Sequence, residues 1–242
     1  MSSDKHLRLR VFAGPNGSGK STLTSIIGGM FNMGVYVNAD DLKISIVSKQ
    51  RLDFSDFGIQ VDKQEFDSGW LNSTYRKGDE AEYWEFENNG LCFYDLDKLD
   101  DYFVAFLADF IRQCLLGRRI RFSFETVMSN PSKLDLMQKA KERGYKVYLY
   151  FVSLSDPQLN VLRVRSRVSE GGHDVIEEKI VSRYDRTMDL LYKALMIADS
   201  AYIFDNSGSE LKMIAKKERG ILQALVEYVP SWYKLFVLDK IK

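Results

Sequence analysis

The stretch "GPNGSGKS" (14–21) decides the fold of this 242-residue chain. It follows the apolar run "LRLRVFA" (7–13) and leads into "TLTSIIGGM" (22–30), so we expect a strand before it and a helix after it. The spacing fits the pattern G-x-x-x-x-G-K-[ST], in which glycines allow successive backbone N–H groups to turn towards phosphate oxygens. The stretch therefore predicts a phosphate-binding loop and an α/β fold of the P-loop type.

The chemistry expected of this loop is nucleotide binding. Lys20 is expected to reach the β- and γ-phosphates, and the Ser21 hydroxyl is expected to bind Mg²⁺. The partial positive charge of a helix N-terminus adds to the attraction for phosphate. These features predict ATP and Mg²⁺ as cofactors. The expected contacts from this stretch are Gly14, Pro15, Asn16, Gly17, Ser18, Gly19, Lys20, Ser21 and Thr22.

The rest of the chain alternates short apolar runs with helical patterns, which is typical of βαβ units. We therefore expect a mainly parallel, five-stranded sheet with helices on both faces. The chain is interpreted as a single domain over 1–242. The expected strands lie at 7–13, 35–37, 119–125, 145–152 and 201–205.

Three further segments have distinct patterns. The periodicity of 97–117 predicts a helix with Leu99, Phe103, Phe106 and Phe110 facing the core. The acidic, aromatic-rich segment 51–100 does not follow the βαβ rhythm and is interpreted as an insertion, either a surface excursion with its own aromatic cluster or a wall beside a substrate. The residues after about 209 are expected to form a C-terminal helical extension to 242.

Composition limits the classes of partner. Lysine plus arginine equals aspartate plus glutamate at 34 each, which gives no reason to expect nucleic acid or a membrane as a partner. The chain lacks an apolar run of the length a membrane span needs. Cys92 and Cys114 have neither metal-binding nor disulfide spacing, so reduced cysteines and a cytoplasmic protein are expected.

The stretch "VYVNADDLK" (35–43) offers a candidate base. A carboxylate at the end of a strand beside the phosphate-binding loop could take the proton of an acceptor hydroxyl, so Asp40 is predicted to be catalytic. Asp41 is expected instead to open the following helix, where an acidic side chain complements the helix dipole.

Two more groups of polar residues are candidates for the site. Glu125 and Thr126 end the strand-like run "RFSFET" (121–126), at the sheet edge where ligands bind in open α/β folds. A transferring phosphoryl group carries negative charge, which could be stabilised by the guanidinium groups of Arg163, Arg167 and Arg183. The alternative is a solvated charged helix.

Two weaker signals lie further along the chain. His173 follows two glycines and is expected to be a loop residue and not a base. The run "YIFDNSG" (202–208) is a second strand end with short polar side chains, for which an Asx turn is the alternative to a binding role.

Taken in order, "AGPNGSGKSTLT", "VNADDLK", "FSFETVMS", "RVRSRVSEGGHDVIEEKIVSRYDR" and "AYIFDNS" resemble the zeta toxin family of P-loop kinases over roughly 8–208. The resemblance implies ATP-dependent phosphorylation of the 3′-hydroxyl of a UDP-N-acetylhexosamine. It implies Lys20 as the phosphate lysine, Ser21 as the Mg²⁺ ligand and Asp40 as the base. It also places Arg163 and Asn206 at the nucleotide, Glu125 and Thr126 with Asp40 at the acceptor, and Arg167 and Arg183 at the transferring group.

The predicted function is therefore that of a small-molecule kinase whose favoured acceptor is a nucleotide sugar. The resemblance also implies an antitoxin protein as a candidate partner. The alternatives are a kinase for another nucleotide or metabolite, and an ATP-gated interaction protein with slow ATPase activity in which the 51–100 surface contacts another protein. A nucleic-acid-stimulated ATPase is disfavoured by the neutral overall charge and the acidic insertion.

Overall fold

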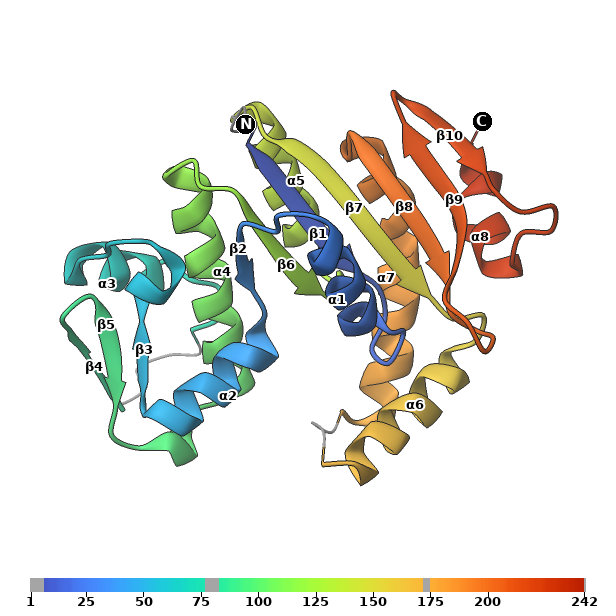
Figure 1. Cartoon of the computed structure of the whole chain (residues 1–242). Coiled ribbons are helices and arrows are strands. Elements are labelled where there is room, and N and C mark those ends of the chain that lie inside the picture. The colour runs from blue at the N-terminus through green and yellow to red at the C-terminus, as the bar shows by residue number, and fades with distance from the viewer. Residues whose placement is uncertain (1–6, 77–82, 172–174, 242) are drawn as a thin grey trace. The chain divides into compact units, whose positions relative to one another are not determined.

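The computed structural model describes residues 7–76, 83–171 and 175–241 (Figure 1). The chain forms two compact units. The first unit combines Met1–Asn32 with Phe124–Lys242, and the second unit is Met33–Ser123. The single domain expected over 1–242 stays a prediction.

The first unit is built on a sheet in which the strands follow the order β10-β9-β8-β7-β1-β6. The pairs β1–β7 and β7–β8 are parallel, whereas β8–β9 and β9–β10 are antiparallel. Apolar side chains such as Leu9, Val11 and Phe151 are fully buried, which explains why these runs form central strands. The strands are β1 (Arg8–Ala13), β6 (Phe122–Thr126), β7 (Lys146–Ser153), β8 (Ser200–Asp205), β9 (Lys212–Glu218) and β10 (Ile221–Ala224).

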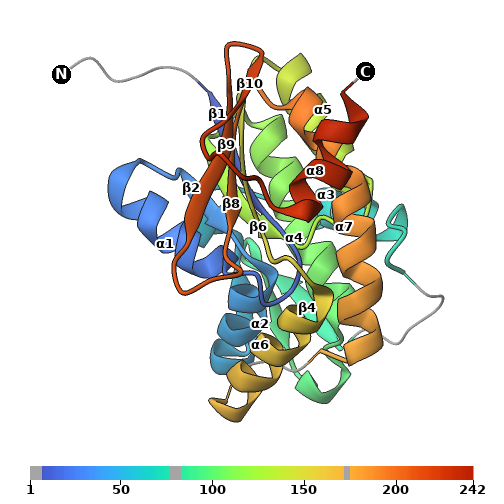
Figure 2. The ribbon, with the colours of Figure 1, turned by 90° about the vertical axis from the view of Figure 1, so that its right-hand side faces the viewer.

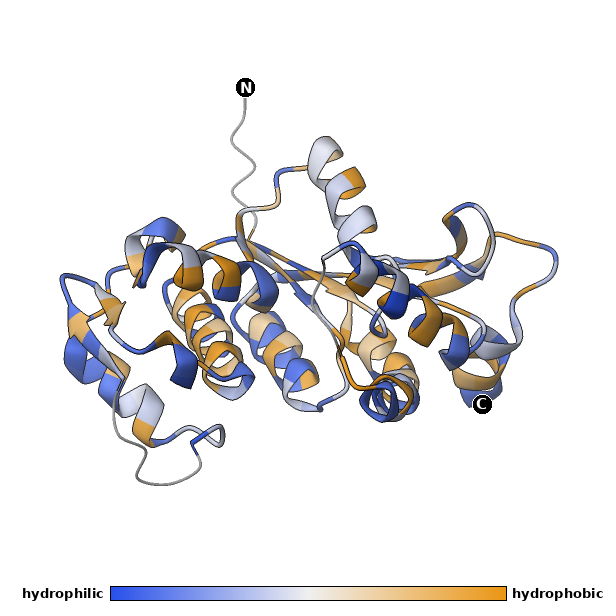
Figure 3. Ribbon diagram, turned by 90° about the horizontal axis from the view of Figure 1, so that it is seen from below, coloured by the Kyte–Doolittle hydropathy of each residue, from blue (hydrophilic) through white to orange (hydrophobic). Residues whose placement is uncertain are grey.

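Helices cover both faces of this sheet. Helix α1 lies on one face, and α5, α7 and α8 lie on the other (Figures 1 and 2). The helices carry both hydrophobic and hydrophilic residues, as amphipathic helices do (Figure 3). Their bounds are α1 (Lys20–Met30), α5 (Ser132–Glu142), α6 (Pro157–Ser169), α7 (Glu177–Ile197) and α8 (Ser231–Phe236), followed by the 3₁₀ turn η3 (Leu238–Lys240).

The C-terminal region differs from the expected helical extension over 209–242. Residues 212–224 form the antiparallel hairpin β9–β10, which adds strands to the five that were predicted. Its two-residue turn, Arg219-Gly220, has φ angles of 50° and 80°, as a type I′ hairpin requires. Only the short α8 and η3 are helical here, so the prediction was wrong because this turn signal outweighed the helical pattern.

The second unit contains a three-stranded antiparallel sheet in the order β3-β5-β4. Its N-terminal strand, β2 (Val35–Val37), donates a hydrogen bond of 3.0 Å from the Val35 backbone N–H to the Arg121 carbonyl. The other elements are α2 (Ala39–Lys49), β3 (Arg51–Asp53), η1 (Phe54–Phe57), α3 (Lys63–Leu71), β4 (Trp84–Glu87), β5 (Gly90–Phe93), η2 (Leu96–Lys98) and α4 (Asp101–Gly117).

An aromatic cluster forms the core of the second unit. The ring of Phe66, which is fully buried, lies 5.1 Å from Trp84, 5.3 Å from Phe110 and 5.8 Å from Phe106, centroid to centroid. The predicted core face of 97–117 is confirmed, because Leu99, Phe103, Phe106 and Phe110 are all buried. The aromatic side chains of 51–100 therefore pack with α4 into a core of their own.

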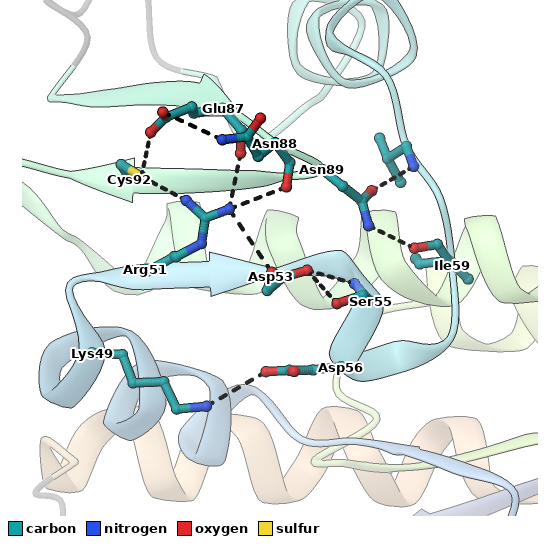
Figure 4. Close-up of polar contacts among 11 residues, drawn as sticks. Lys49, Arg51, Asp53, Ser55, Asp56, Ile59, Glu87, Asn88, Asn89 and Cys92 are labelled. Carbon is teal, nitrogen blue, oxygen red and sulfur yellow. Dashed lines mark hydrogen bonds and ion pairs between the residues drawn. The ribbon is translucent and has the colours of Figure 1, made fainter.

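Polar contacts fix the β4–β5 hairpin to β3 (Figure 4). Its turn residues Asn88 and Asn89 have φ angles of 46° and 60°, again the type I′ geometry. The Arg51 guanidinium donates to the carbonyls of Glu87 at 3.0 Å and Asn88 at 3.1 Å. The Asn89 side chain bonds to the backbone of Ile59 and Val61, so the hairpin is anchored on both sides.

Within the part of the chain that the structure describes, none of the helices combines the length and the hydropathy needed to cross a membrane. The predicted cytoplasmic location stays a prediction.

Candidate nucleotide site

The loop between β1 and α1 has the backbone geometry that the sequence pattern predicts. Gly14 and Gly19 have φ angles of 150° and 98°, in a region that side chains disfavour. A Cβ on Gly14 would lie 2.0 Å from the Val152 carbonyl oxygen, and one on Gly19 would lie 2.4 Å from Asn206 Nδ2. Only glycine fits at both places, so the loop can bring its backbone close to its neighbours.

Lys20 folds back over this loop. Its ammonium group donates hydrogen bonds of 3.0 Å to the carbonyl oxygens of Gly14 and Pro15. Both of these partners of the Lys20 ammonium are neutral carbonyls. An ammonium group forms its strongest hydrogen bonds with anions such as phosphate. The cation therefore lies where the sequence analysis places the phosphate groups.

Glu125, at the end of β6, contacts the first turn of α1. Ser21 Oγ donates to Glu125 Oε2 at 3.2 Å, and Thr24 Oγ1 lies 2.7 Å from Glu125 Oε1. Thr24 Oγ1 also lies 2.9 Å from the Lys20 carbonyl oxygen. The structure thus brings the predicted metal ligand Ser21 together with Glu125. The predicted role of Glu125 at the acceptor stays a prediction.

A polar bracket holds the loop from outside, formed by Asn160 and Arg163 of α6 and by Asn206, which follows β8. Asn160 Nδ2 donates to the Asn16 carbonyl at 2.5 Å, and Asn206 Nδ2 donates to the Ser18 carbonyl at 2.9 Å. The Arg163 guanidinium donates to the Asn206 carbonyl at 2.6 Å. The predicted nucleotide residue Asn206 is therefore bonded to the loop backbone, and Arg163 is bonded to the backbone of Asn206.

Three buried polar atoms of the loop region have no hydrogen-bond partner among the described residues. They are Asn16 Oδ1, Ser18 Oγ and Asn160 Oδ1. Ser18 and Asn160 are both 0% exposed. Because buried polar groups are nearly always satisfied, these atoms indicate hydrogen bonds to a ligand or to ordered water.

Asp40 belongs to the second unit, in the first turn of α2. The helix begins at Ala39 and its cap is Asn38, whose side chain accepts a 3.0 Å hydrogen bond from the Asp40 N–H. Asp40 and Asp41 are both exposed and both lie in this turn. The expected division, with Asp40 ending a strand and only Asp41 opening a helix, was therefore wrong, because the amide of Asn38 already supplies the cap. The catalytic role of Asp40 stays a prediction.

The remaining predicted residues lie in the first unit. Arg167 is exposed on α6, one turn after Arg163, and Arg183 is half-buried on α7. Thr126 Oγ1 accepts a 2.9 Å hydrogen bond from the Met128 N–H, which supports the turn after β6. His173 lies outside the described residues. The roles of these arginines and of Thr126 stay predictions.

A buried tyrosine supports this end of the sheet. Tyr184 of α7 donates a 2.9 Å hydrogen bond to the Leu154 carbonyl, just after β7. Burial raises the pKa of Tyr184 to about 12, so the hydroxyl stays protonated as a donor.

Comparison with known proteins shows a family resemblance over the second half of this site. The family model "Zeta toxin" matches residues 97–213 of the chain. The match includes Glu125, Arg167, Arg183 and Asn206, and the phosphate-binding loop precedes it. The predicted resemblance to the zeta toxin family is confirmed over these residues.

Two comparisons with solved structures support the fold of this zeta toxin-like chain. The native AvrRxo1-ORF1:-ORF2 complex has a TM-score of 0.56 at 16% identity, covering 96% of this chain and 64% of that chain. The same complex with ATP has a TM-score of 0.53 at 16% identity, covering 91% and 61%. The predicted α/β fold with a mainly parallel sheet is confirmed.

A curated relative is an uncharacterized protein of Haemophilus influenzae, 33% identical over 69 residues, which are 28% of this chain. The matched part spans 49% of that relative, and the chain spans less than two thirds of the length of the AvrRxo1 chains.

Sequence reasoning missed two residues of the zeta toxin-like site. Thr24 lies one helical turn after the glycine motif, so its position on the same face as Ser21 could have been found from the i, i+3 spacing. Asn160 is separated from its partner Asn16 by 144 positions, and no local pattern marks it.

Proposed function

We propose that this chain is an ATP-dependent kinase that transfers the γ-phosphoryl group to a hydroxyl of a small molecule. The observation that carries the proposal is the loop itself, in which glycine geometry, Lys20 and Ser21 are assembled with Glu125 in one unit. Such a loop binds the phosphates of a nucleotide through backbone N–H groups and a lysine. The zeta toxin match gives the phosphotransferase class.

The donor set beside the loop fits Mg²⁺. Ser21 and Glu125 supply a hydroxyl and a carboxylate, which are hard oxygen ligands, and the two oxygens lie 3.2 Å apart. Ser21 would ligate the ion and Glu125 would hold it either directly or through water. When bound, Mg²⁺ neutralises charge on the phosphate oxygens.

The roles of the protein's own side chains follow from the transfer. The acceptor hydroxyl oxygen forms a bond to the γ-phosphorus while the bond to the β,γ-bridging oxygen breaks, and ADP leaves. Asp40 accepts the hydroxyl proton, a contribution of roughly 10²–10⁴ in rate. Lys20, Arg167 and Arg183 balance the charge on the transferring group, because guanidinium groups offer paired donors to equatorial oxygens.

The favoured acceptor is a UDP-N-acetylhexosamine, by resemblance to the zeta toxins. The second unit, in which the aromatic residues of 51–100 pack with α4, also contains Asp40, which we assign to the acceptor. A partner protein of the antitoxin kind is proposed as well. In its support, the similar solved structures are complexes of two chains, AvrRxo1-ORF1 and -ORF2.

The proposal is tested by incubating the protein with Mg²⁺ and γ-labelled ATP and a panel of UDP-sugars, nucleosides and nucleotides. Label is expected to move to a sugar hydroxyl of a UDP-N-acetylhexosamine. The matched pair Asp40→Asn and Asp41→Asn separates the base from its neighbour: the first variant loses transfer by about 10²–10⁴ and still binds ATP, and the second keeps it.

Two outcomes would count against this function. Label that stays on ATP with every acceptor, together with slow release of phosphate, would favour the ATP-gated interaction protein. Equal losses in the two aspartate variants would remove Asp40 as the base.

A further inference from the structure

A cavity of about 880 Å³ lies in the first unit at the edge of the sheet opposite the phosphate-binding loop. The loop follows the carboxyl end of β1, whereas the cavity opens at the amino ends of β7 and β8 and beside the β9–β10 turn. Six residues of β1 span roughly 20 Å, so the two places are well separated. We call it the tyrosine-lysine cavity. Its walls include Lys146, Tyr148, Ser200, Tyr202, Lys216 and Arg219.

Positive charge predominates in this cavity. Its described lining residues include the cations Lys141, Lys146, Lys216, Lys217 and Arg219 against the carboxylates of Asp199 and Glu218. Both carboxylates are engaged. Asp199 accepts a 2.8 Å hydrogen bond from the Val147 N–H and pairs with Lys141 at 3.3 Å. Glu218 pairs with Lys216 at 3.0 Å. The excess charge suits an anionic ligand.

The five cations are not equivalent. Lys217 is buried and donates to the carbonyls of Leu195, Met196 and Ala198 at the end of α7, so its charge is directed into the protein. Lys216 is the next residue along β9 and projects from the other face of the sheet. Arg219 occupies a turn position with a φ of 50°, where asparagine or glycine is preferred. Lys216 and Arg219 thus bring two cations to the hairpin side of the cavity.

Tyrosine rings form the floor of the cavity. Tyr202 is opposite Tyr150 in the β7–β8 register, and their rings stack with centroids 5.3 Å apart. Tyr148, two residues before Tyr150, lies on the same face, and the Lys146 ammonium is 5.7 Å from its ring centroid. Tyr148 and Tyr202 are half-buried and both line the cavity. The Arg10 guanidinium lies 5.5 Å from the Tyr148 ring centroid, and the Tyr202 hydroxyl donates to Glu218 at 3.2 Å. A flat aromatic group could stack on the parts of these rings that face the cavity.

We propose that the tyrosine-lysine cavity is a second nucleotide site, in which a base stacks on Tyr148 and Tyr202 and a phosphate group is bound by Lys146, Lys216 and Arg219. Aromatic rings next to cations are the combination that recognises a base joined to a phosphate. The volume lies within the range of small-molecule sites. The site is independent of the phosphate-binding loop and of the proposed kinase activity.

The test uses the full chain with one molar equivalent of a non-hydrolysable ATP analogue and Mg²⁺, which fills the phosphate-binding loop and leaves little free analogue to compete at the cavity. Titration with AMP and with UMP, followed by calorimetry, is expected to give a Kd below about 1 mM for at least one of them. Lys216→Glu is expected to raise that Kd about tenfold or more, and so is Tyr202→Leu. The matched control is Lys212→Glu, which reverses a charge on the same strand outside the cavity and leaves the Kd unchanged.

The proposal fails if neither nucleotide binds in the millimolar range, or if Lys216→Glu and Lys212→Glu change the Kd equally. Melting curves show which variants are folded, and Lys216→Glu carries the test alone if Tyr202→Leu unfolds. A trinucleotide distinguishes the source of the ligand. Binding much tighter than that of the mononucleotide would indicate a nucleotide within a single strand, and similar or weaker binding would indicate a free nucleotide.

Discussion

The phosphate-binding loop of the first unit and the core of the second unit are stabilised by different kinds of contact. The phosphate-binding loop of the first unit is held by polar contacts to backbone carbonyls, from Asn160, Asn206 and Lys20. The core of the second unit is held by rings packed around Phe66. Polar contacts fix the position of individual atoms, whereas apolar packing contributes most of the free energy of folding. A substitution in the phosphate-binding loop should therefore affect chemistry most, and one in the aromatic core around Phe66 should affect stability most.

The largest effect is expected from Phe66→Ala in the second unit. Removing a fully buried ring with several aromatic neighbours should lower the free energy of unfolding by about 3–5 kcal/mol, because a cavity remains. Urea unfolding followed by tryptophan fluorescence measures this change. Phe66→Leu, which keeps much of the volume, should cost clearly less. A loss below about 1 kcal/mol for Phe66→Ala would contradict the comparison.

The counterpart in the first unit is Lys20→Ala. Losing the cation at the loop should reduce ATP-dependent transfer by roughly 10²–10³, the cost of removing one preorganised electrostatic contact. The melting temperature should change little, because Lys20 is half-buried and contacts the carbonyls of Gly14 and Pro15, which are neutral acceptors. If Lys20→Ala leaves transfer unaltered or fails to fold, the contrast between a loop that serves chemistry and an aromatic core that serves stability is wrong.

A middle case is Asn160→Ala, which removes part of the polar bracket. The Asn16 carbonyl would lose its donor, and the cost in stability is expected to be about 1–3 kcal/mol. Because that carbonyl belongs to the loop, the affinity for ATP should fall as well. Thr24→Val is the matched variant at the other side of the loop, where the contacts of the hydroxyl with Glu125 and with the Lys20 carbonyl are lost. Stability loss without any change in ATP affinity would show that the bracket does not position the loop.

The smallest effect concerns Cys114 in the second unit. Burial raises the pKa of this thiol from 9.0 to about 12, and the neighbouring Glu65 carboxylate adds to the rise. The contribution to stability is complete below pH 9. It is lost as pH rises towards 12, because the unfolded thiol ionises first, at up to about 1.4 kcal/mol per pH unit. When urea unfolding is measured from pH 8 to 11, the free energy of unfolding should therefore fall less steeply with pH for Cys114→Ala than for the wild type.

The sequence predicted the first unit better than the second. The four long apolar runs form strands, because their apolar side chains are buried in a sheet. The glycine motif predicted the loop between β1 and α1, since a loop of that geometry has few alternative sequences. The roles of Lys20 and Ser21 stay predictions. In the second unit, the short run at 35–37 was predicted as a strand. The strands of 51–100 were missed, because β3, β4 and β5 are three or four residues long and their order depends on tertiary contacts.

The candidate site shows the same contrast at the level of single residues. Asn206 was predicted by resemblance and Arg163 from the pattern of arginines, yet no motif states that Asn206 bonds to the backbone of the loop and that Arg163 bonds to the Asn206 carbonyl. The start of α2 was misplaced because Asp40 and Asp41 are good first-turn residues and Asn38 is a better cap. In each case a contact between residues decided what a local pattern left open.

The bond between Asn206 and Ser18 has a consequence for synthesis of the chain. The two residues are 188 positions apart, so the loop has all of its contacts only when the chain has been made as far as Asn206. At about 5–20 residues per second, the loop waits roughly 10–40 s for this contact. Until then the emerging chain has its lysine and glycines without the Asn206 contact. The geometry of the loop is thus tied to synthesis of a distant segment, and a polypeptide released before Asn206 would lack that contact.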